Sequence, residues 1–350
     1  MRQRAIFNGR VLALVLCAAA AGAADARRIP APSAQEQKQG EQKQKGGASD
    51  AESKAAQAVQ SAADPNAVAV AASEFVKKYP KSSLRPQVAR AVLSKIAAVQ
   101  DPAQRATFAE GFSKIFDSPD EAMLAAPVII DAYVDAKRYD DAYRLATPDA
   151  VAKFEDPLGV MISLAITGAD QVRQQNPKYV PASQQLGLKA VELIEGDKKP
   201  ARVDDARWGE YKTKWLPQLY QSLGLLSLAS GDKADAKAKL AKALALNPTD
   251  ANTYILLGAI ANDEYQQTAQ QHKAASGAAK DELLKQAQAQ LDVVIDAWAH
   301  AVALTEGDAR ADQMRAQLMQ DLESYYKYRH GSADGLQQLI AKYKKPAGQP

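Results

Sequence analysis

The chain has 350 residues, of which 47% are hydrophobic, 24% charged and only 6% aromatic, and its formal net charge is +3. A single hydrophobic core rarely grows beyond about 250–300 residues, so the length excludes one compact domain and predicts two domains or an elongated array. The abundance of alanine, the scarcity of β-branched runs and the mixing of both charge signs are typical of a helical protein with solvated outer faces.

The first 23 residues have the order of segments found in a secretory signal peptide. A basic region with three arginines precedes an apolar run over 11–20, which is too short to span a bilayer. A small-residue A-x-A motif then ends at Ala23, and a second one ends at Ala26. We therefore expect export to the periplasm or extracellular space with cleavage near Ala23, which leaves no integral membrane span. An uncleaved anchor is the alternative.

Cleavage would also change the chemistry of the chain. Its only cysteine, Cys17, lies in the apolar run behind Leu16, where lipoprotein signals carry a small residue, so neither a lipid anchor nor a thiol catalyst is expected. Residues 1–23 carry three arginines and no acid, so the net charge of the mature chain would be 3 − 3 = 0. A neutral chain lacks the basic excess of nucleic-acid-binding proteins, and no nucleic-acid partner is expected.

Residues 24–49 form a low-complexity segment. It contains prolines and a run of glutamine, glutamate and lysine over 35–45. Such a segment has almost no apolar surface to bury, which predicts a disordered tether. The alternative is a charged interaction arm.

The sequence pattern over residues 50–202 predicts divergent helical repeats, with helices interrupted by proline, glycine and aspartate. A helix over 66–79 carries Val70 and Phe75 and should end before Pro80, because proline cannot continue it. The stretch over 75–82 resembles the ends of second helices in repeat proteins of bacterial envelope assembly. The next helix should open at Pro86 and present one apolar face, formed by Val88, Val92, Leu93 and Ile96.

Three more helical segments are expected before residue 202. Over 120–146, Tyr133 and Ala142 stand nine residues apart, and a small residue on the second helix of a pair lets the first approach closely. Helices over 157–174 and 182–195 should follow. Connections between helices are expected at three prolines, Pro177, Pro181 and Pro200.

The clearest pattern covers 217–258. Tyr220, Leu223 and Gly224 are followed on a second helix by a series of small and large residues, Ala236, Leu240, Ala243 and Pro248. Thirty-four residues after Tyr220, the same spacing returns at Tyr254, Leu257 and Gly258. This period and these residues resemble the tetratricopeptide repeat, a helix–turn–helix unit of 34 residues. Ser227 departs from the pattern, since the family usually has a large residue there.

The second repeat resumes late. Val294, Trp298, Ala301 and Glu306 match Ala236, Leu240, Ala243 and Pro248 at an offset of 58 in place of 34, which indicates a 24-residue insertion. The insertion is centred on 266–280 and should lengthen both helices, with a turn near 275–277. Insertions in repeat arrays often lie on a working face. A tolerated helical extension is the alternative.

Two helices should complete the region 203–345 of tetratricopeptide-like repeats. The first has an apolar stripe and ends at Gly331, and the second has another stripe over 336–343. The first stripe consists of Met314, Leu318, Leu322 and Tyr325. We interpret this pair as the cap that an open repeat array needs.

Residues that could perform chemistry are few. Asp296 and His300 are four apart on one helix, as two metal ligands would be, but no third ligand accompanies them. No phosphate-binding or nucleophile-elbow motif occurs in the sequence. We therefore expect no catalytic, cofactor-binding or metal-binding residues. Trp208 and Trp215, seven apart, are either core residues or an exposed binding pair.

The resemblance to tetratricopeptide-repeat proteins implies an all-α solenoid of antiparallel helix pairs, in an exported bacterial member of the family. First helices of successive repeats line a concave groove in that family. By this carry-over, the groove of the present chain would be lined by Gln218, Gln221, Leu225, Asn252, Ile255, Ala259 and Asn262. Its uncharged polar face suits an extended or helical peptide held by amide hydrogen bonds.

The expected function is that of a non-enzymatic scaffold or adaptor of the cell envelope, which binds a protein or peptide partner and needs no cofactor. One alternative is a hydrolase or metal-binding enzyme on a helical scaffold. Another is a purely structural spacer, expected if no face carries an extended apolar patch.

Overall fold

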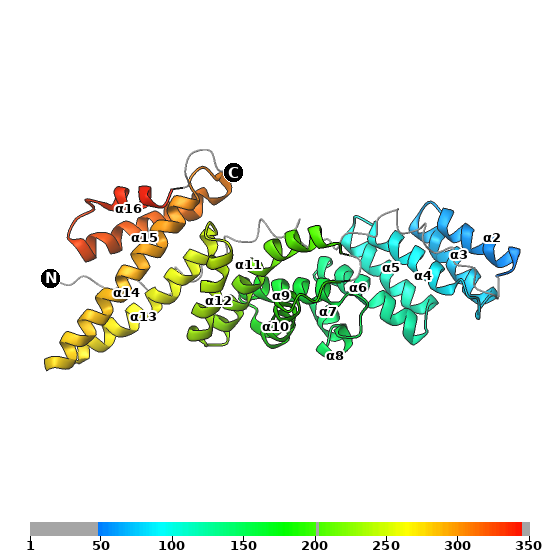
Figure 1. The fold of residues 1–350 in the computed structure, drawn as a ribbon, viewed down its shortest axis with the longest axis horizontal. Coiled ribbons are helices and arrows are strands. Elements are labelled where there is room, and N and C mark those ends of the chain that lie inside the picture. Colours follow the sequence, from blue (N-terminus) through cyan, green and yellow to red (C-terminus); the bar gives the residue numbers. More distant parts are fainter. Residues whose placement is uncertain (1–47, 201–202, 345–350) are drawn as a thin grey trace. The chain divides into compact units, whose positions relative to one another are not determined.

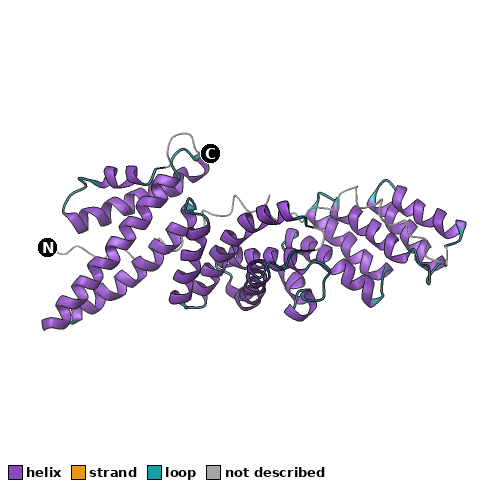
Figure 2. Ribbon diagram, viewed as in Figure 1, coloured by secondary structure: helices purple, strands orange, loops and turns teal. Residues whose placement is uncertain are grey.

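A computed structural model describes residues 48–200 and 203–344, and every regular element in these ranges is helical (Figures 1 and 2). The predicted signal peptide and most of the predicted tether lie outside the described residues. The N-terminal helices are α2 (Asp50–Ser61), α3 (Pro65–Lys78), α4 (Arg85–Ala97), α5 (Pro102–Ile115), α6 (Pro119–Asp135), α7 (Tyr139–Leu145), α8 (Pro148–Val151) and α9 (Pro157–Arg173). The later elements are η2 (Pro177–Tyr179), α10 (Val180–Glu195), α11 (Asp205–Ala229), α12 (Lys233–Leu246), α13 (Ala251–Ala274), α14 (Gly277–Leu304), η3 (Ala309–Ala311), α15 (Asp312–His330) and α16 (Leu336–Lys342).

The sequence places the helix ends by local chemistry. Ser49 and Ser118 each form a capping box with a glutamate three residues later, which satisfies two otherwise unpaired backbone N–H groups. Proline occupies the first turn of many helices, where its missing N–H costs nothing. Pro181 is one of these: it is the second residue of α10 and does not lie in a connection as predicted. At the other end of a helix, Gly331 closes α15 with a φ of 86°, a conformation that glycine adopts without strain.

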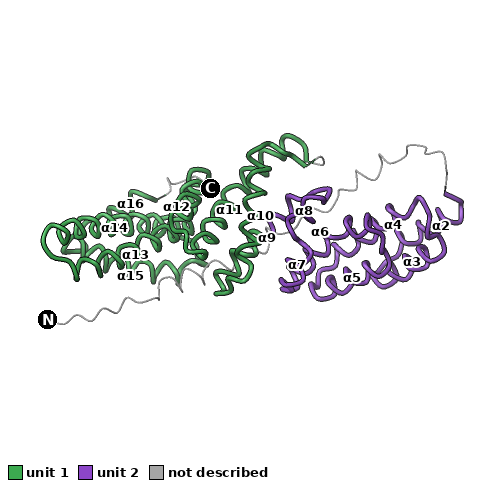
Figure 3. The backbone as a smooth tube through the Cα atoms, turned by 90° about the horizontal axis from the view of Figure 1, so that it is seen from below, with its two compact units in different colours: residues 1–26, 165–350 green, residues 27–164 purple. Residues whose placement is uncertain are grey.

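The described chain divides into two compact units, with the division inside α9 between Leu164 and Ala165 (Figure 3). The predicted boundary at residue 202 therefore falls within the second unit along the chain. The N-terminal unit runs to Leu164, and the C-terminal unit contains all of the 34-residue pattern.

The N-terminal unit packs its helices as sequential neighbours. Each of the four apolar residues predicted for the face of α4 is buried, at 5% exposure or less. Phe75 of α3 is also buried, whereas Val70 on the same helix is 60% exposed and belongs to the solvated face. The helical interpretation of 66–97 is thus confirmed, with one apolar residue on the outer side.

The described part of this unit contains two ion pairs in which one partner is buried and the other is partly exposed, which the sequence did not indicate. Arg85 at the start of α4 donates to both carboxylate oxygens of Glu121 on α6, at 2.7 and 2.9 Å. Arg105 on α5 pairs with Asp135 at the end of α6. The first pair links α4 to α6 across the intervening α5, and the second links α5 to the helix that follows it. Both pairs therefore help to fix how these helices pack.

In the C-terminal unit, α12 begins at Lys233 and ends at Leu246, two residues before Pro248. The helix before it is longer than the repeat, because α11 starts at Asp205 and continues through Pro217. Trp208 therefore belongs to the same helix as the repeat and is 5% exposed. Asp235 and Lys239, four residues apart on α12, form an ion pair with 3.5 Å between their charged atoms.

The predicted insertion lengthens both helices of its pair. α13 and α14 run side by side as the longest hairpin of the unit, and only Ala275 and Ser276 separate them (Figure 1). The positions that were matched across the insertion are buried to the same degree: Ala236, Leu240, Val294, Trp298 and Ala301 are 0% exposed and Ala243 is 2% exposed. The offset of 58 residues is thus reproduced by the packing.

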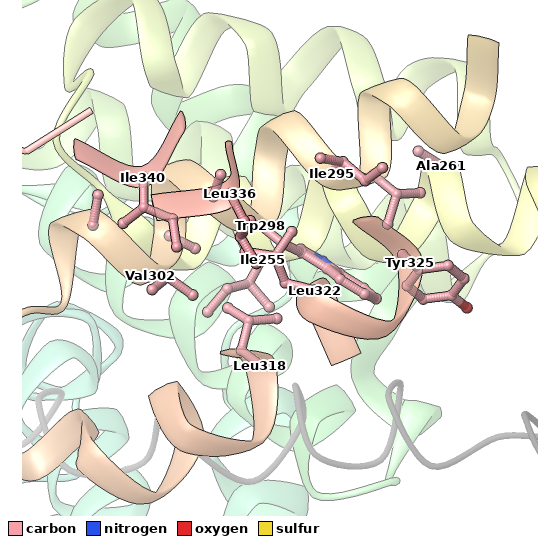
Figure 4. Packing of buried hydrophobic residues seen from close by; sticks show 14 of the residues in the cluster. Ile255, Ala261, Ile295, Trp298, Val302, Leu318, Leu322, Tyr325, Leu336 and Ile340 are labelled. Atoms are coloured by element: carbon pink, nitrogen blue, oxygen red, sulfur yellow. The ribbon is translucent and has the colours of Figure 1, made fainter. Parts of the chain in front are cut away.

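The C-terminal helices α15 and α16 close one hydrophobic cluster around Trp298 (Figure 4). The helix α15 contributes Leu318, Leu322 and Tyr325 to this cluster, and α16 contributes Leu336 and Ile340. Every predicted apolar position of these two helices is buried or packed against the cluster. Tyr325 lies at its edge with the hydroxyl directed outward (Figure 4).

Candidate partner-binding face

Three of the seven predicted groove residues are buried, so the prediction that they line a groove open to a partner is wrong. Leu225, Ile255 and Ala259 are 2%, 4% and 4% exposed. Ile255 belongs to the cluster closed by α15 and α16. Because α13 packs against the elongated α14, Ile255 and Ala259 serve the core and are not available to a partner.

The predicted amide residues on α11 and α13 are more accessible. Asn252 is exposed and Gln218 is half-buried, and the two stand 34 residues apart at equivalent repeat positions. Gln221 is half-buried and donates a hydrogen bond to Asp250, the N-cap of α13, and another to Thr253 at 3.0 Å. Gln221 therefore holds α11 to the start of α13, and the open part of the face consists of Gln218 and Asn252.

The seventh residue, Asn262, is engaged by the C-terminal helix α15. The hydroxyl of Tyr325 donates to the Asn262 carbonyl oxygen at 2.7 Å and accepts from the Gln266 amide at 3.2 Å. Burial, as the largest cause, holds the pKa of Tyr325 above its ordinary value. Asn262, the last predicted groove residue on α13, is thus occupied by a contact with α15 of the same chain.

Ser227, the departure from the family pattern, has a polar role. It is 2% exposed, and its hydroxyl donates to the Asp235 carboxylate across the turn at 2.6 Å. The Gln184 amide of α10 approaches the same hydroxyl at 3.5 Å. A hydrogen bond to a charged acceptor here replaces the packing of a large side chain.

Asp296 and His300 do come together, but in an aromatic stack. The His300 ring lies between the rings of Tyr254 and Tyr343, with centroid distances of 4.4 and 3.4 Å. Tyr343 donates its hydroxyl to Asp296, and burial together with this bond raises the pKa of Tyr343 to about 12. Within the described ranges, no three His, Cys, Asp or Glu side chains are grouped as a metal site would require.

The two tryptophans of α11 have different surroundings. Trp208 is a core residue, as the first interpretation expected, and its indole N–H donates to Asp197 at 2.6 Å. Trp215 is half-buried, and the Lys214 ammonium lies 4.8 Å from its ring centroid. Tyr211 stands between the two indoles, so the aromatic row is continuous on one face of the helix.

A hollow of about 320 Å³ opens between α14, α15 and α16. Its floor is apolar, from Val302, Met319 and Ile340. Its charged rim is internally compensated, since Glu306 pairs with Lys344 at 2.8 Å and Asp312 with Arg315 at 2.7 Å. The rim therefore carries no free charge to select a ligand.

One polar face on α15 was missed by the sequence analysis. Asp321 is half-buried and lies on the side of the helix that also carries Tyr325 and the 75% exposed Tyr328. The Tyr265 ring of α13 meets the Tyr325 ring edge-on, with centroids 6.1 Å apart. We name these four residues the tyrosine–aspartate face. The available signal was an acid spaced four and seven residues before two tyrosines.

Comparison with family models, with curated proteins and with solved structures gave no match for this chain. In the portion that the structure describes, none of the helices has the length and apolar character needed to cross a membrane. The described chain is thus assigned to the all-α class, as helices packed in neighbouring pairs.

Proposed function

We propose that this protein is a non-enzymatic, exported scaffold of the cell envelope that binds a segment of another protein through tetratricopeptide-like helix pairs. The observation that carries this proposal is the repeated close packing of glycine against a large residue of the partner helix. A Cβ on Gly224 would lie 2.7 Å from the Leu240 side chain, and one on Gly258 would overlap Trp298. The two contacts recur at one spacing, allowing for the insertion.

The proposed binding face is the open remainder of the predicted groove. Gln218 and Asn252 occupy equivalent positions of successive repeats, one on α11 and one on α13. Their amides both donate and accept, as recognition of an extended or helical backbone requires. The neighbouring Gln221–Asp250–Thr253 bonds hold the two helices together beneath this face.

The test is affinity capture from an envelope extract, with the mature chain from Ala24 as bait and mass spectrometry as the readout. A double variant, Gln218→Arg with Asn252→Arg, places two bulky cations on the proposed face without touching the core. We expect a partner that is recovered with the wild type and lost with this variant.

The matched control adds the same charge elsewhere in the repeat. Ala238→Arg with Ala245→Arg places two arginines at exposed positions of α12, which carries none of the proposed binding residues. Equal recovery with both double variants would reject the face. Recovery of no specific protein would contradict the scaffold and favour a structural spacer.

A further inference from the structure

Asp321 differs from the other acidic residues of its surroundings because it has no cationic partner in the part of the chain that the structure describes. On α15, Asp312 pairs with Arg315 and Glu323 with Lys327. On α13, the neighbouring helix, Asp263 and Glu264 pair with two lysines of α12, Lys233 and Lys237. The remaining cation near the end of α15, Arg329, pairs with Asp292 of α14.

The bonds that Asp321 does make are weak. Among the residues that the structure describes, only the Gln317 amide reaches it, at 3.4 Å from each carboxylate oxygen. Burial outweighs these bonds and raises the pKa of Asp321 above its ordinary value. A half-buried carboxylate without a counter-charge is destabilised in its ionised form, and a cation brought from outside would relieve this cost.

The aromatic side chains beside Asp321 suit the same kind of ligand. Tyr328 lies two helical turns further along the same side of α15, about 10 Å along the axis, and 75% of its surface is exposed. Burial, and after it the nearby Tyr328 hydroxyl, raises the pKa of Tyr265, so the two tyrosine hydroxyls lie close together. An exposed tyrosine ring offers an apolar surface on which the aliphatic stem of a lysine or arginine can lie.

We propose that the tyrosine–aspartate face binds a cationic side chain, lysine or arginine, presented by the partner segment. The Asp321 carboxylate accepts hydrogen bonds from the ammonium or guanidinium group, and the aliphatic stem of the ligand lies on the Tyr328 ring. This inference rests on the proposed scaffold function and assigns a charge to its partner. It is carried by charge complementarity, because Asp321 is the one uncompensated acid on the described lengths of α13 and α15.

The test uses the full chain and blocked seven-residue Ala/Gly peptides with a central arginine, lysine, norleucine or glutamate. Binding is followed by the NMR ring signals of Tyr265 and Tyr328. We expect saturable shifts with the arginine and lysine peptides only. Norleucine keeps the aliphatic stem of lysine without its charge, so equal binding of the norleucine peptide would overturn the proposal.

Variants of the chain complete the test. Asp321→Asn should weaken arginine-peptide binding by about tenfold, the effect of losing one charged hydrogen-bond acceptor. Asp281→Asn removes an exposed negative charge on α14 and should leave binding unchanged. Asparagine relieves the burial cost of the carboxylate, so folding should be retained, which thermal melting checks. Unchanged affinity in Asp321→Asn would overturn the proposal.

The two proposals fail separately. If the peptides do not bind but capture still depends on Gln218 and Asn252, the scaffold stands and the cation site is wrong. If the peptides bind as expected but capture recovers no partner, the cation site stands without the scaffold.

Discussion

The backbone of Gly258 lies directly against the indole ring of Trp298, and a Cβ at this position would overlap the indole nitrogen and its neighbouring carbon. Trp298 is 0% exposed and stands at the centre of the cluster closed by α15 and α16. Gly258→Ala should therefore destabilise the C-terminal unit by about 3 kcal/mol, because a large buried ring cannot move aside. Chemical denaturation followed by tryptophan fluorescence measures the change.

The matched control is Gly209→Ala, at an exposed position in the second turn of α11 where a Cβ meets no atom within 4 Å. It should stabilise the unit by about 0.5–1 kcal/mol, since alanine is the better helix former. In a Trp298→Leu background, which copies Leu240 of the other repeat, Gly258→Ala should cost less. An equal cost in both backgrounds would mean that the indole is not the obstacle.

The Arg85–Glu121 pair makes the N-terminal unit sensitive to acid. Burial alone would raise the pKa of Glu121, but hydrogen bonds from Arg85 and Ser118 outweigh it and hold the pKa below its ordinary value. The stabilisation is therefore full above the pKa of an unfolded glutamate, about 4.3, and is lost as the pH falls through the lower folded value. Glu121→Gln should cost about 2 kcal/mol at neutral pH, the contribution of a charged hydrogen bond, and much less in acid.

Hydrogen–deuterium exchange of the α6 backbone measures this effect. Glu155→Gln is the control, because Glu155 pairs with Arg90 while both side chains are more than half exposed. Surface pairs contribute about 0–1 kcal/mol, so this variant should exchange like the wild type. If Glu121→Gln also left the exchange rates of α6 unchanged at neutral pH, the Arg85–Glu121 pair would not stabilise the unit.

Tyr343 gives the C-terminal unit a sensitivity to alkali. Burial and the hydrogen bond to Asp296 raise the pKa of its hydroxyl to about 12, from an ordinary value of 10.0. The stabilisation is present below the unfolded pKa, about 10, and is lost as the pH rises through the folded value. Asp296→Asn should lower the pKa of Tyr343, which titration of tyrosinate absorbance against a Tyr343→Phe reference detects. An unchanged titration in Asp296→Asn would contradict the contact.

Much of the fold could be predicted from the sequence because its signals are local. The turn at 230–232 and the end of α12 follow from glycine and proline, and the match of Trp298 to Leu240 follows from periodicity. The start of α11 was harder to predict from the sequence. The repeat pattern was recognised only from residue 217, yet the helix begins at Asp205 and passes through Pro217, with Trp208 buried and bonded to Asp197.

The binding face was predicted less well, because it depends on what α15 and α16 cover. From their repeat positions alone, Ile255 and Asn262 were predicted to line the groove together with Gln218. In the structure, the C-terminal helices enclose Ile255, and Tyr325 of α15 donates a hydrogen bond to Asn262. Asp321 became a candidate only when the partners of the surrounding acids were known. Such pairing across helices leaves no pattern in a single sequence.

The distal part of the α13–α14 hairpin should open more readily than its base. Between residues 266 and 290, only Thr268 and Ala287 are buried, whereas the base contributes a continuous series of core residues. Local stability follows buried apolar contact, so backbone amides over 269–286 should exchange with solvent faster than those over 291–303. Hydrogen–deuterium exchange with mass spectrometry resolves the two regions.

A single substitution near the tip tests whether the two regions open independently. Ala279→Gly, at an exposed position of α14, lowers helix stability by about 1 kcal/mol without removing a core contact. Exchange should accelerate over 269–286 and stay unchanged over 291–303, because the Trp298 cluster holds the base closed. Acceleration along the whole hairpin would instead mean that tip and base unfold as one cooperative unit.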